Sequence, residues 1–317
     1  MTALGAALVM GFFFWCMPFV AVAPVEKVMF VVPDFSAVAP PGQAVLLFAG
    51  DMMFARSIRK ATDVHGDDYI FSCLREELHS VDLVVANLEG PITPYASISI
   101  ESAIGSGENM TFTFPTSTAQ LLKRHNIGVV NIGNNHILNF GRDGVVQTKK
   151  WLNEAEVQYF GDPHVSEGER VARRMVHDIP FSFINWSDWT GGTKAEVIAH
   201  ITAERAVGRL PIVYTHWGDE YVPPSERVQQ LARSFVDAGA EIVIGTHPHV
   251  VLEHEEYKGK YIYYSLGNFI FDQYFNEDVR NGLMLRIAFD GSGVTAITPI
   301  PTYLERDRRT CVREIGK

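Results

Sequence analysis

The chain has 317 residues, of which 47% are hydrophobic, and a formal net charge of -10. This length can bury one large core or two small ones, and the acidic balance excludes the basic excess that marks nucleic-acid-binding proteins. We therefore expect a folded protein with no nucleic-acid partner, in which any polyanionic ligand must be met by local positive charge.

The first apolar stretch, residues 3–25, carries no charged side chain and is long enough to cross a bilayer as a helix. Three interpretations remain open: an uncleaved anchor, which we favour, a cleaved signal peptide ending near residues 21–23, and a buried helix. We expect residues 1–26 to form this anchor or signal segment, in a single pass with the rest of the chain outside the cytoplasm. A proline-rich linker at residues 27–43 follows.

The three cysteines, Cys16, Cys73 and Cys311, lie far apart and form no Cys-x-x-Cys pair. Neither a thiolate zinc site nor a disulfide framework is therefore indicated. A bridge between Cys73 and Cys311 is one alternative, and two buried or free thiols are the interpretation we favour. Cysteine usage leaves the redox compartment open.

From residue 44 onward, apolar runs alternate with helical patterns, which predicts βαβ units and a largely parallel sheet. The strand-like runs are residues 44–50, 81–89, 127–135, 181–187, 210–218, 241–249 and 261–271. Helical patterns occupy residues 116–125, 143–155 and 225–240, the last with Ser225 as N-cap and with Val228, Leu231, Ala232, Phe235 and Val236 on one face. One α/β domain at residues 44–306 and a tail at residues 307–317 are the expected organisation.

Polar side chains follow five of these runs at the point where each strand should end. They are Asp51, then Asn87 and Glu89, then Asn134, Asn135 and His136, then His216, and finally His247 and His249. Ligands bind at the carboxyl edge of open α/β sheets, and clustered carboxylates and imidazoles are typical metal ligands. A solvated turn explains one such strand end but not five, so the pattern predicts a metal site.

Six motifs occur in order along the chain: GDMMFAR, NLEGPIT, NNHILNFG, YTHWGDEY, GTHPHVV and YSLGNFIFD. In this order they resemble the CapA/PgsA family of poly-γ-glutamate capsule proteins, over about residues 45–305. That family in turn resembles calcineurin-like metallophosphoesterases. The resemblance implies two packed β-sheets flanked by helices, an α/β/β/α sandwich, with one or two divalent ions (Mn, Zn or Fe) at the strand ends.

The resemblance also implies roles for single residues. The implied metal ligands are Asp51, Glu89, Asn135, His216, His247 and His249. His136 would act on the substrate as a catalytic residue, and Asn87 and Asn134 would contribute to substrate binding. Arg56, five residues after Asp51, could hold a phosphate or carboxylate oxygen beside the catalytic His136, with a surface ion pair as the alternative.

Three positions depart from the implied patterns. Met53 stands where phosphoesterases have the histidine of Asp-x-His, the stretch at residues 87–89 replaces a Gly-Asp pair, and Asn139 replaces the acid of NNHxxDxG. One expected metal ligand is therefore missing. Among the remaining polar residues near the motifs, we expect Asp219 and Glu220 to be solvated or to support the ligands. We expect the role of holding loops together for Asn185, Asn268 and Asp272.

Three functions are compatible with this sequence. The first is a membrane-anchored, extracytoplasmic component of poly-γ-glutamate capsule synthesis or export. Its expected partners are the membrane, an acidic polymer or phosphate-bearing substrate, and other capsule-synthesis membrane subunits. The second is a metal-dependent phosphoesterase acting on a small phosphate ester. The third is a non-catalytic scaffold subunit, which the departures at Met53 and Asn139 would suit, and fold alone does not choose among the three.

Overall fold

The computed structural model describes residues 42–164 and 170–313. The predicted membrane-spanning run at residues 3–25 and most of the predicted linker lie outside these ranges. Among the described helices, none combines the length and the apolar character that crossing a bilayer requires.

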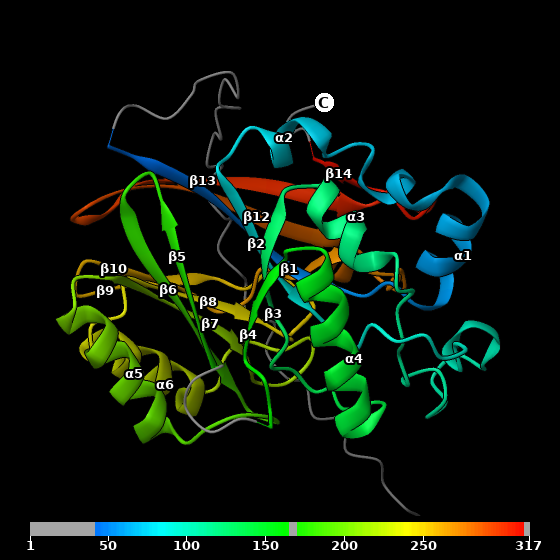
Figure 1. Ribbon diagram of the computed structural model, residues 1–317, viewed down its shortest axis with the longest axis horizontal. Coiled ribbons are helices and arrows are strands. Elements are labelled where there is room, and N and C mark those ends of the chain that lie inside the picture. The colour runs from blue at the N-terminus through cyan, green and yellow to red at the C-terminus, as the bar shows by residue number, and fades with distance from the viewer. Residues whose placement is uncertain (1–41, 165–169, 314–317) are drawn as a thin grey trace, which may run out of the picture. The chain divides into compact units, whose positions relative to one another are not determined.

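The described strands form two sheets (Figure 1). The first has the order β14-β13-β12-β1-β2-β3-β4 with β11 paired to β1, and its strands are β1 (Ala44–Met52), β2 (Leu83–Leu88), β3 (Ile127–Asn131), β4 (Gln158–Phe160), β11 (Asn268–Ile270), β12 (Asn281–Asp290), β13 (Gly293–Leu304) and β14 (Thr310–Val312). The second has the order β5-β6-β7-β8-β10-β9, and its strands are β5 (Val171–Val176), β6 (Ile179–Ser187), β7 (Leu210–His216), β8 (Ile242–Thr246), β9 (His254–Tyr257) and β10 (Lys260–Tyr263).

Helices cover the outer face of each sheet. Those on the first sheet are α1 (Arg56–His65), α2 (Arg75–His79), α3 (Thr118–Arg124) and α4 (Gly141–Glu154), and those on the second are α5 (Lys194–Ala206) and α6 (Glu226–Asp237). Among the described residues, short 3-10 helices lie in connections: η1 (Asp67–Phe71), η2 (Ser99–Glu101) and η4 (Asp278–Arg280). The predicted pair of packed sheets flanked by helices is confirmed.

Strand β1 shows how the sequence builds these layers. All nine of its residues are buried. Leu46 and Phe48 belong to the core between the two sheets, whereas Val45 and Leu47 belong to the core under the helices. Successive side chains of a strand point to opposite faces, so a strand buried on both faces reads as an unbroken apolar run.

The parallel strands bring their carboxyl ends to common edges. Strands β1, β2 and β3 are parallel neighbours in the first sheet, as are β6, β7 and β8 in the second. The two sheets approach closely there, since the Tyr214 hydroxyl of β7 donates a hydrogen bond to the Ala49 carbonyl of β1. The strand ends of both sheets therefore meet at one seam.

The predicted strand at residues 261–271 is wrong as a single element. It divides into β10 in the second sheet and β11 in the first. Between them Gly267 has a positive φ of 68°, and its carbonyl accepts a hydrogen bond from the Asp51 amide at 3.1 Å. A Cβ on Gly50 would lie 1.8 Å from the Gly267 oxygen, so glycine at position 50 permits the close approach of the two backbones.

The sheet also extends beyond residue 306, into the segment assigned to a tail. Strand β14 pairs with β13, and its Cys311 forms a disulfide with Cys73, which precedes α2. The favoured interpretation of two free thiols is therefore wrong. Cysteine spacing could not reveal the pair, because 238 positions separate its members.

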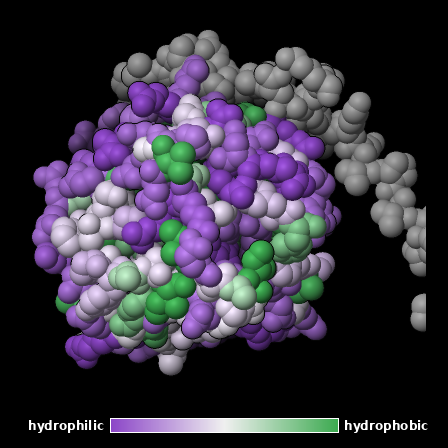
Figure 2. All heavy atoms as spheres, turned by 90° about the vertical axis from the view of Figure 1, so that its right-hand side faces the viewer, coloured by the Kyte–Doolittle hydropathy of each residue, from purple (hydrophilic) through white to green (hydrophobic). Residues whose placement is uncertain are grey.

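A long connection joins β2 to α3. It carries η2 and reaches α1, where Asn109 and Met110 contact the Arg56 guanidinium. Figure 2 shows the side of the molecule on which α1 lies in Figure 1, with apolar groups scattered among hydrophilic ones. Ile98 and Ile104 are exposed apolar side chains of this connection.

We expect the disulfide to stabilise the fold, because it restricts the unfolded chain over a long loop. Replacing Cys311 by Ser should lower the free energy of unfolding by about 2–5 kcal/mol, measured by urea denaturation. Reductant should have the same effect on the wild type and none on the variant. Cys16→Ser, which leaves the bridge intact, is the matched control, and equal stability of Cys311→Ser and wild type would contradict the bridge.

Candidate metal centre

The five polar strand ends meet at the seam between the sheets. Asn87 Nδ2 lies 2.7 Å from Asp51 Oδ1 and 3.3 Å from His216 Nδ1. The His247 amide donates to Asp51 Oδ2 at 3.0 Å, and His216 Nε2 lies 3.0 Å from Asn135 Oδ1. Residues from β1, β2, β3, β7 and β8 are thus brought together, as the sequence predicts.

Two carboxyl groups lie buried in this centre. Asp51 and Glu89 are both 0% exposed. Burial raises the pKa of Asp51 to about 6, against the opposing effect of the His247 amide. Burial and the negative charge of Asp51 raise the pKa of Glu89 well above 4.5. Among the described residues, none donates a hydrogen bond to either oxygen of Glu89, and a buried carboxylate in this condition requires a proton or a cation.

Four imidazoles surround these acids. Burial lowers the pKa of His136 and of His247 to about 4, and it lowers the pKa of His216 and of His249 well below 6.5. All four rings are therefore neutral at physiological pH, which is the form that ligates metals. Burial acts in opposite directions on acids and bases: it keeps the four imidazoles neutral, and it opposes ionisation of the two carboxyl groups when no cation is bound.

Asn268 fixes the orientation of His249. Its amide nitrogen faces the carbonyl oxygens of His249 and Val279 and the side-chain oxygen of Gln273, so its Oδ1 faces His249 Nδ1 at 2.9 Å. Nδ1 must then carry the hydrogen, and Nε2 keeps its lone pair. That nitrogen lies 3.6 Å from Glu89 Oε1. The sequence predicts that Asn268 staples a loop. In the structure Asn268 also orients His249, so that a ring nitrogen able to bind a metal faces Glu89.

The His-Pro-His turn is not extended. His247 and His249 have φ values of 95° and 57°, in the left-handed region that non-glycine residues avoid. The i, i+2 spacing of the two histidines and Pro248 between them predict extended backbone, and this prediction is wrong. Two hydrogen bonds hold the turn instead: His247 N to Asp51 Oδ2, and Tyr221 N to the Pro248 carbonyl at 2.9 Å. Strained backbone of this kind clusters at functional sites.

Arg56 lies beside the centre, and the ion pair that it forms is largely buried instead of lying on the surface. Its Nη2 is 2.5 Å from Asp272 Oδ1, and the two side chains are only 12% and 8% exposed. Its guanidinium lies 5.0 Å from the centroid of the Phe112 ring. The centroid of the His136 ring lies 4.3 Å from that same Phe112 centroid. Within residues 42–164 and 170–313, Arg56 Nε has no hydrogen-bond partner. Arg56 and His136 thus share one aromatic support.

A network of asparagines joins the two sheets beneath the centre. Asn131 donates to Asn87 Oδ1 at 3.0 Å, and Asn185 of the second sheet donates to Asn131 Oδ1 at 2.9 Å. Asn134 donates to Asn87 Oδ1 at 3.2 Å and accepts from the His136 amide at 3.1 Å. Asn87 and Asn134 are 0% exposed and position their neighbours through these hydrogen bonds, and their contact with substrate stays a prediction.

Asn131 was missed in the sequence because it lies inside a strand-like run. Its position at the carboxyl end of β3 was the available signal. Thr246 was missed for the same reason, and its Oγ1 lies 3.0 Å from His216 Nδ1. At the departure positions, Met53 is buried and its sulfur accepts the Ala55 amide. Asn139 Oδ1 lies 3.2 Å from His136 Nδ1.

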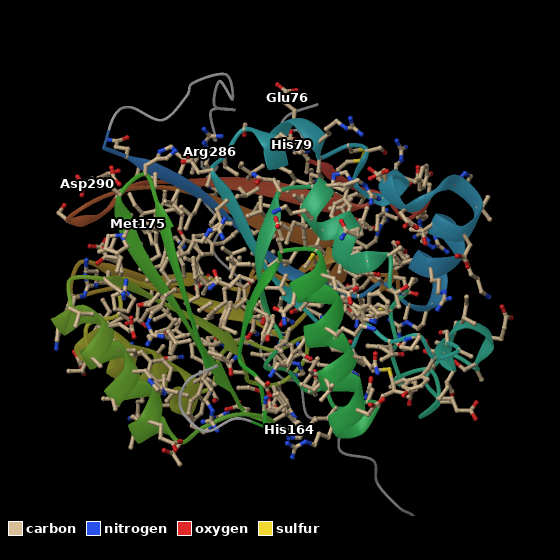
Figure 3. All side chains as sticks on the ribbon, viewed as in Figure 1. Glu76, His79, His164, Met175, Arg286 and Asp290 are labelled. Atoms are coloured by element: carbon tan, nitrogen blue, oxygen red, sulfur yellow. A yellow bond between two sulfur atoms is a disulfide. The ribbon has the colours of Figure 1, made fainter. Side chains whose placement is uncertain are left out.

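The histidines outside the motifs do not join the centre. They are His65, His79, His125, His164, His177, His200 and His254. Figure 3 shows His79 on α2 and His164 at the opposite edge of the view. His125 is paired with Asp68 at 2.8 Å. Motif position therefore separated the clustered histidines from the others correctly.

We expect Asn139→Asp to raise the pKa of His136 from about 4 by roughly one unit or more, because a carboxylate favours the charged imidazole. NMR titration of the metal-free protein measures this value. Asn139→Ala is the control and should leave the pKa at or below its wild-type value. An unchanged pKa in Asn139→Asp would show that residue 139 does not tune His136.

The region that contains these motifs is also the region in which the chain resembles known proteins. The model of the bacterial capsule synthesis protein family PGA_cap matches residues 45–273. The chain is 28% identical to the PGA biosynthesis protein CapA of Bacillus subtilis (strain 168), over 85% of this chain and 77% of that protein. It is 27% identical to the capsule biosynthesis protein CapA of Bacillus anthracis, over 80% of this chain and 66% of that protein.

The chain also shows similarity over a shorter region to another group of proteins. Over 173 residues, 45% of each chain, the sequence is 27% identical to a probable polyglutamine synthesis accessory protein of Mycobacterium tuberculosis. The PGA_cap match covers most of the chain and includes every strand end that contributes to the centre. The chain therefore belongs to the bacterial capsule synthesis protein family PGA_cap.

Proposed function

We propose that this protein is a membrane-anchored, extracytoplasmic component of capsule polymer synthesis or export, with a cation-dependent, phosphoesterase-like site at the seam of its two sheets. The family and the two CapA relatives support the link to a capsule polymer. The observation that carries the site is the buried group Asp51, Glu89 and His249, whose ligand atoms lie within 4.8 Å of one another.

The residues fit a divalent cation. Glu89 offers two oxygens that receive no hydrogen bond from the described residues, and His249 offers an oriented nitrogen 3.6 Å away. A mixed set of carboxylate and imidazole ligands suits Mn, Zn or Fe. When bound, a divalent cation would supply Lewis-acid polarisation of a phosphoryl or carboxyl oxygen.

Arg56 and His136 suit an anionic substrate. The unused Nε of Arg56 can bind an oxygen of a phosphate or carboxylate. His136 lies 3.9 Å from Glu89 through its Nε2. Its Nδ1 faces Asn139 Oδ1, so the neutral ring keeps a lone pair on Nε2 that can accept a hydrogen bond from the substrate or from an attacking water. The net charge of -10 offers no general attraction to a polyanion, so recognition of an acidic polymer would rest on this local group.

The disulfide between Cys73 and Cys311 supports the extracytoplasmic location, because such bonds persist in oxidising compartments. The uncharged run at residues 3–25 supports the anchor. Carbonate extraction of membranes, followed by protease treatment of intact cells, tests both. We expect a membrane-bound chain whose folded part is digested from outside. A protein released by carbonate, or protected in intact cells, would count against this placement.

The function is tested by deleting the gene in its host and measuring surface polymer. The purified full chain should also be screened for bound metal and for phosphodiesterase and phosphomonoesterase turnover. Loss of polymer that wild type restores and Glu89→Gln does not is the expected result. Polymer production independent of the gene would overturn the capsule role. Bound metal without any turnover would remove the phosphoesterase part and leave a binding subunit.

We expect His247→Ala and His249→Ala to reduce bound Mn or Zn while circular dichroism stays that of the wild type. Both side chains offer nitrogens to the centre and follow the end of β8, so their loss leaves the helices and strands in place. Elemental analysis of the dialysed full chain gives the stoichiometry. His200→Ala, on α5 and away from the motifs, is the matched control. Wild-type metal content in both variants would exclude these histidines as ligands.

A further inference from the structure

We infer that Glu220, in the loop that follows β7, is a metal ligand acting with His247 and His249. This inference rests on the proposed metal-binding function. The sequence predicts the same solvated or supporting role for Glu220 and for its neighbour Asp219. The fold separates the two: Asp219 is exposed, whereas Glu220 is half-buried.

The ligand atoms are close enough to share one cation. A carboxylate oxygen of Glu220 and one ring nitrogen each of His247 and His249 lie within 4.8 Å of one another. Bonds of about 2.0–2.2 Å let two ligands stand up to about 4.4 Å apart across one ion. A small side-chain rotation therefore suffices to bring all three onto the same cation.

One histidine of this group, His247, also carries an unsatisfied nitrogen. His247 is 4% exposed, and its Nδ1 has no hydrogen-bond partner in the part of the chain that the structure describes. A buried nitrogen of this kind normally finds a donor, a water or a cation. His247 belongs to the group with Glu220 but not to the group with Asp51 and Glu89, so the second group gives a metal-binding role to a buried ring that the first group leaves out.

The backbone fixes the loop against the His-Pro-His turn. Tyr221, next to Glu220, has a φ of 64°, and its amide donates to the Pro248 carbonyl at 2.9 Å. At the other end of the loop, the Gly218 amide donates to Asp188 Oδ2 at 2.9 Å. Asp188 is held in turn by Arg227. Glu220 is thus carried between two anchored points, one of which is the turn that presents the histidines.

Side-chain hydrogen bonds complete the link. The Tyr221 hydroxyl accepts from Gln273 at 2.9 Å, and Gln273 accepts from Asn268 at 3.0 Å. Asn268 is the residue that orients His249. The loop bearing Glu220 and the nitrogen of His249 are therefore positioned by one continuous set of bonds, as expected of two ligands of one ion.

Isothermal titration of the chelator-treated full chain with Mn²⁺ or Zn²⁺ tests this inference. Glu220→Gln should weaken binding at least tenfold, and Glu220→Asp should recover part of the loss because it keeps the carboxylate. Asp219→Asn is the matched control, since it removes the same charge from the neighbouring exposed acid and should bind like wild type. Unfolding of the metal-free variants should match wild type.

A structural readout separates ligation from a remote charge effect. In crystals grown with Zn²⁺, anomalous scattering should place the ion within bonding distance of a Glu220 oxygen. Wild-type affinity in Glu220→Gln, or an ion without contact to Glu220, would overturn the inference and leave the proposed function intact. A wild-type chain that binds neither metal would instead overturn the proposed function itself.

Discussion

The burial of two carboxyl groups, Asp51 and Glu89, at the seam between the sheets is the constraint on which the site depends. Both are fully inaccessible to solvent, and Glu89 receives no hydrogen bond from any described residue. A buried charge in this position is strongly unfavourable unless a cation or a proton compensates it. The surrounding hydrogen bonds and the strained His-Pro-His turn hold the residues around these carboxyl groups in place.

The rest of the centre complements this charge. The four imidazoles are neutral because burial lowers the pKa of each, so they offer lone pairs and not competing positive charge. Asn87 donates to Asp51, and Asn268 turns a nitrogen of His249 toward Glu89. Backbone strain at His247 and His249 is sustained because bonds from both sheets hold the turn.

Much of this arrangement follows from the sequence, because strand ends are set by local patterns. Apolar runs that stop at Asp51, Asn87, His216 and His247 place these residues at a sheet edge whatever the tertiary details. The helix N-cap at Ser225 is equally local, and its side chain accepts the Val228 amide.

The parts that could not be predicted depend on contacts distant in sequence. The disulfide joins cysteines on β14 and before α2, and the run at residues 261–271 divides because its two halves pair in different sheets. The left-handed turn at residues 247–249 is imposed by Asp51 and Tyr221, against the local preference of His-Pro-His. Nothing in the spacing of Glu220 shows that its loop folds back onto that turn.

The most direct test of the buried charge is the unfolding stability of Glu89→Gln with and without metal. Because the pKa of Glu89 is raised above its ordinary 4.5, the carboxyl is protonated in both folded and unfolded states at lower pH. As the pH rises above 4.5, the unfolded chain is stabilised by losing the proton of Glu89, whereas the folded chain retains it. The free energy of unfolding of the metal-free protein therefore falls.

At pH 7.5 with chelator, Glu89→Gln should therefore unfold at a higher temperature than wild type, and the difference should vanish near pH 4. With excess Mn²⁺ or Zn²⁺ the order should reverse, because a bound cation stabilises the wild-type fold by mass action. A metal-free variant no more stable than wild type at pH 7.5, together with equal stabilisation of both chains by metal, would contradict a buried carboxylate that awaits a cation.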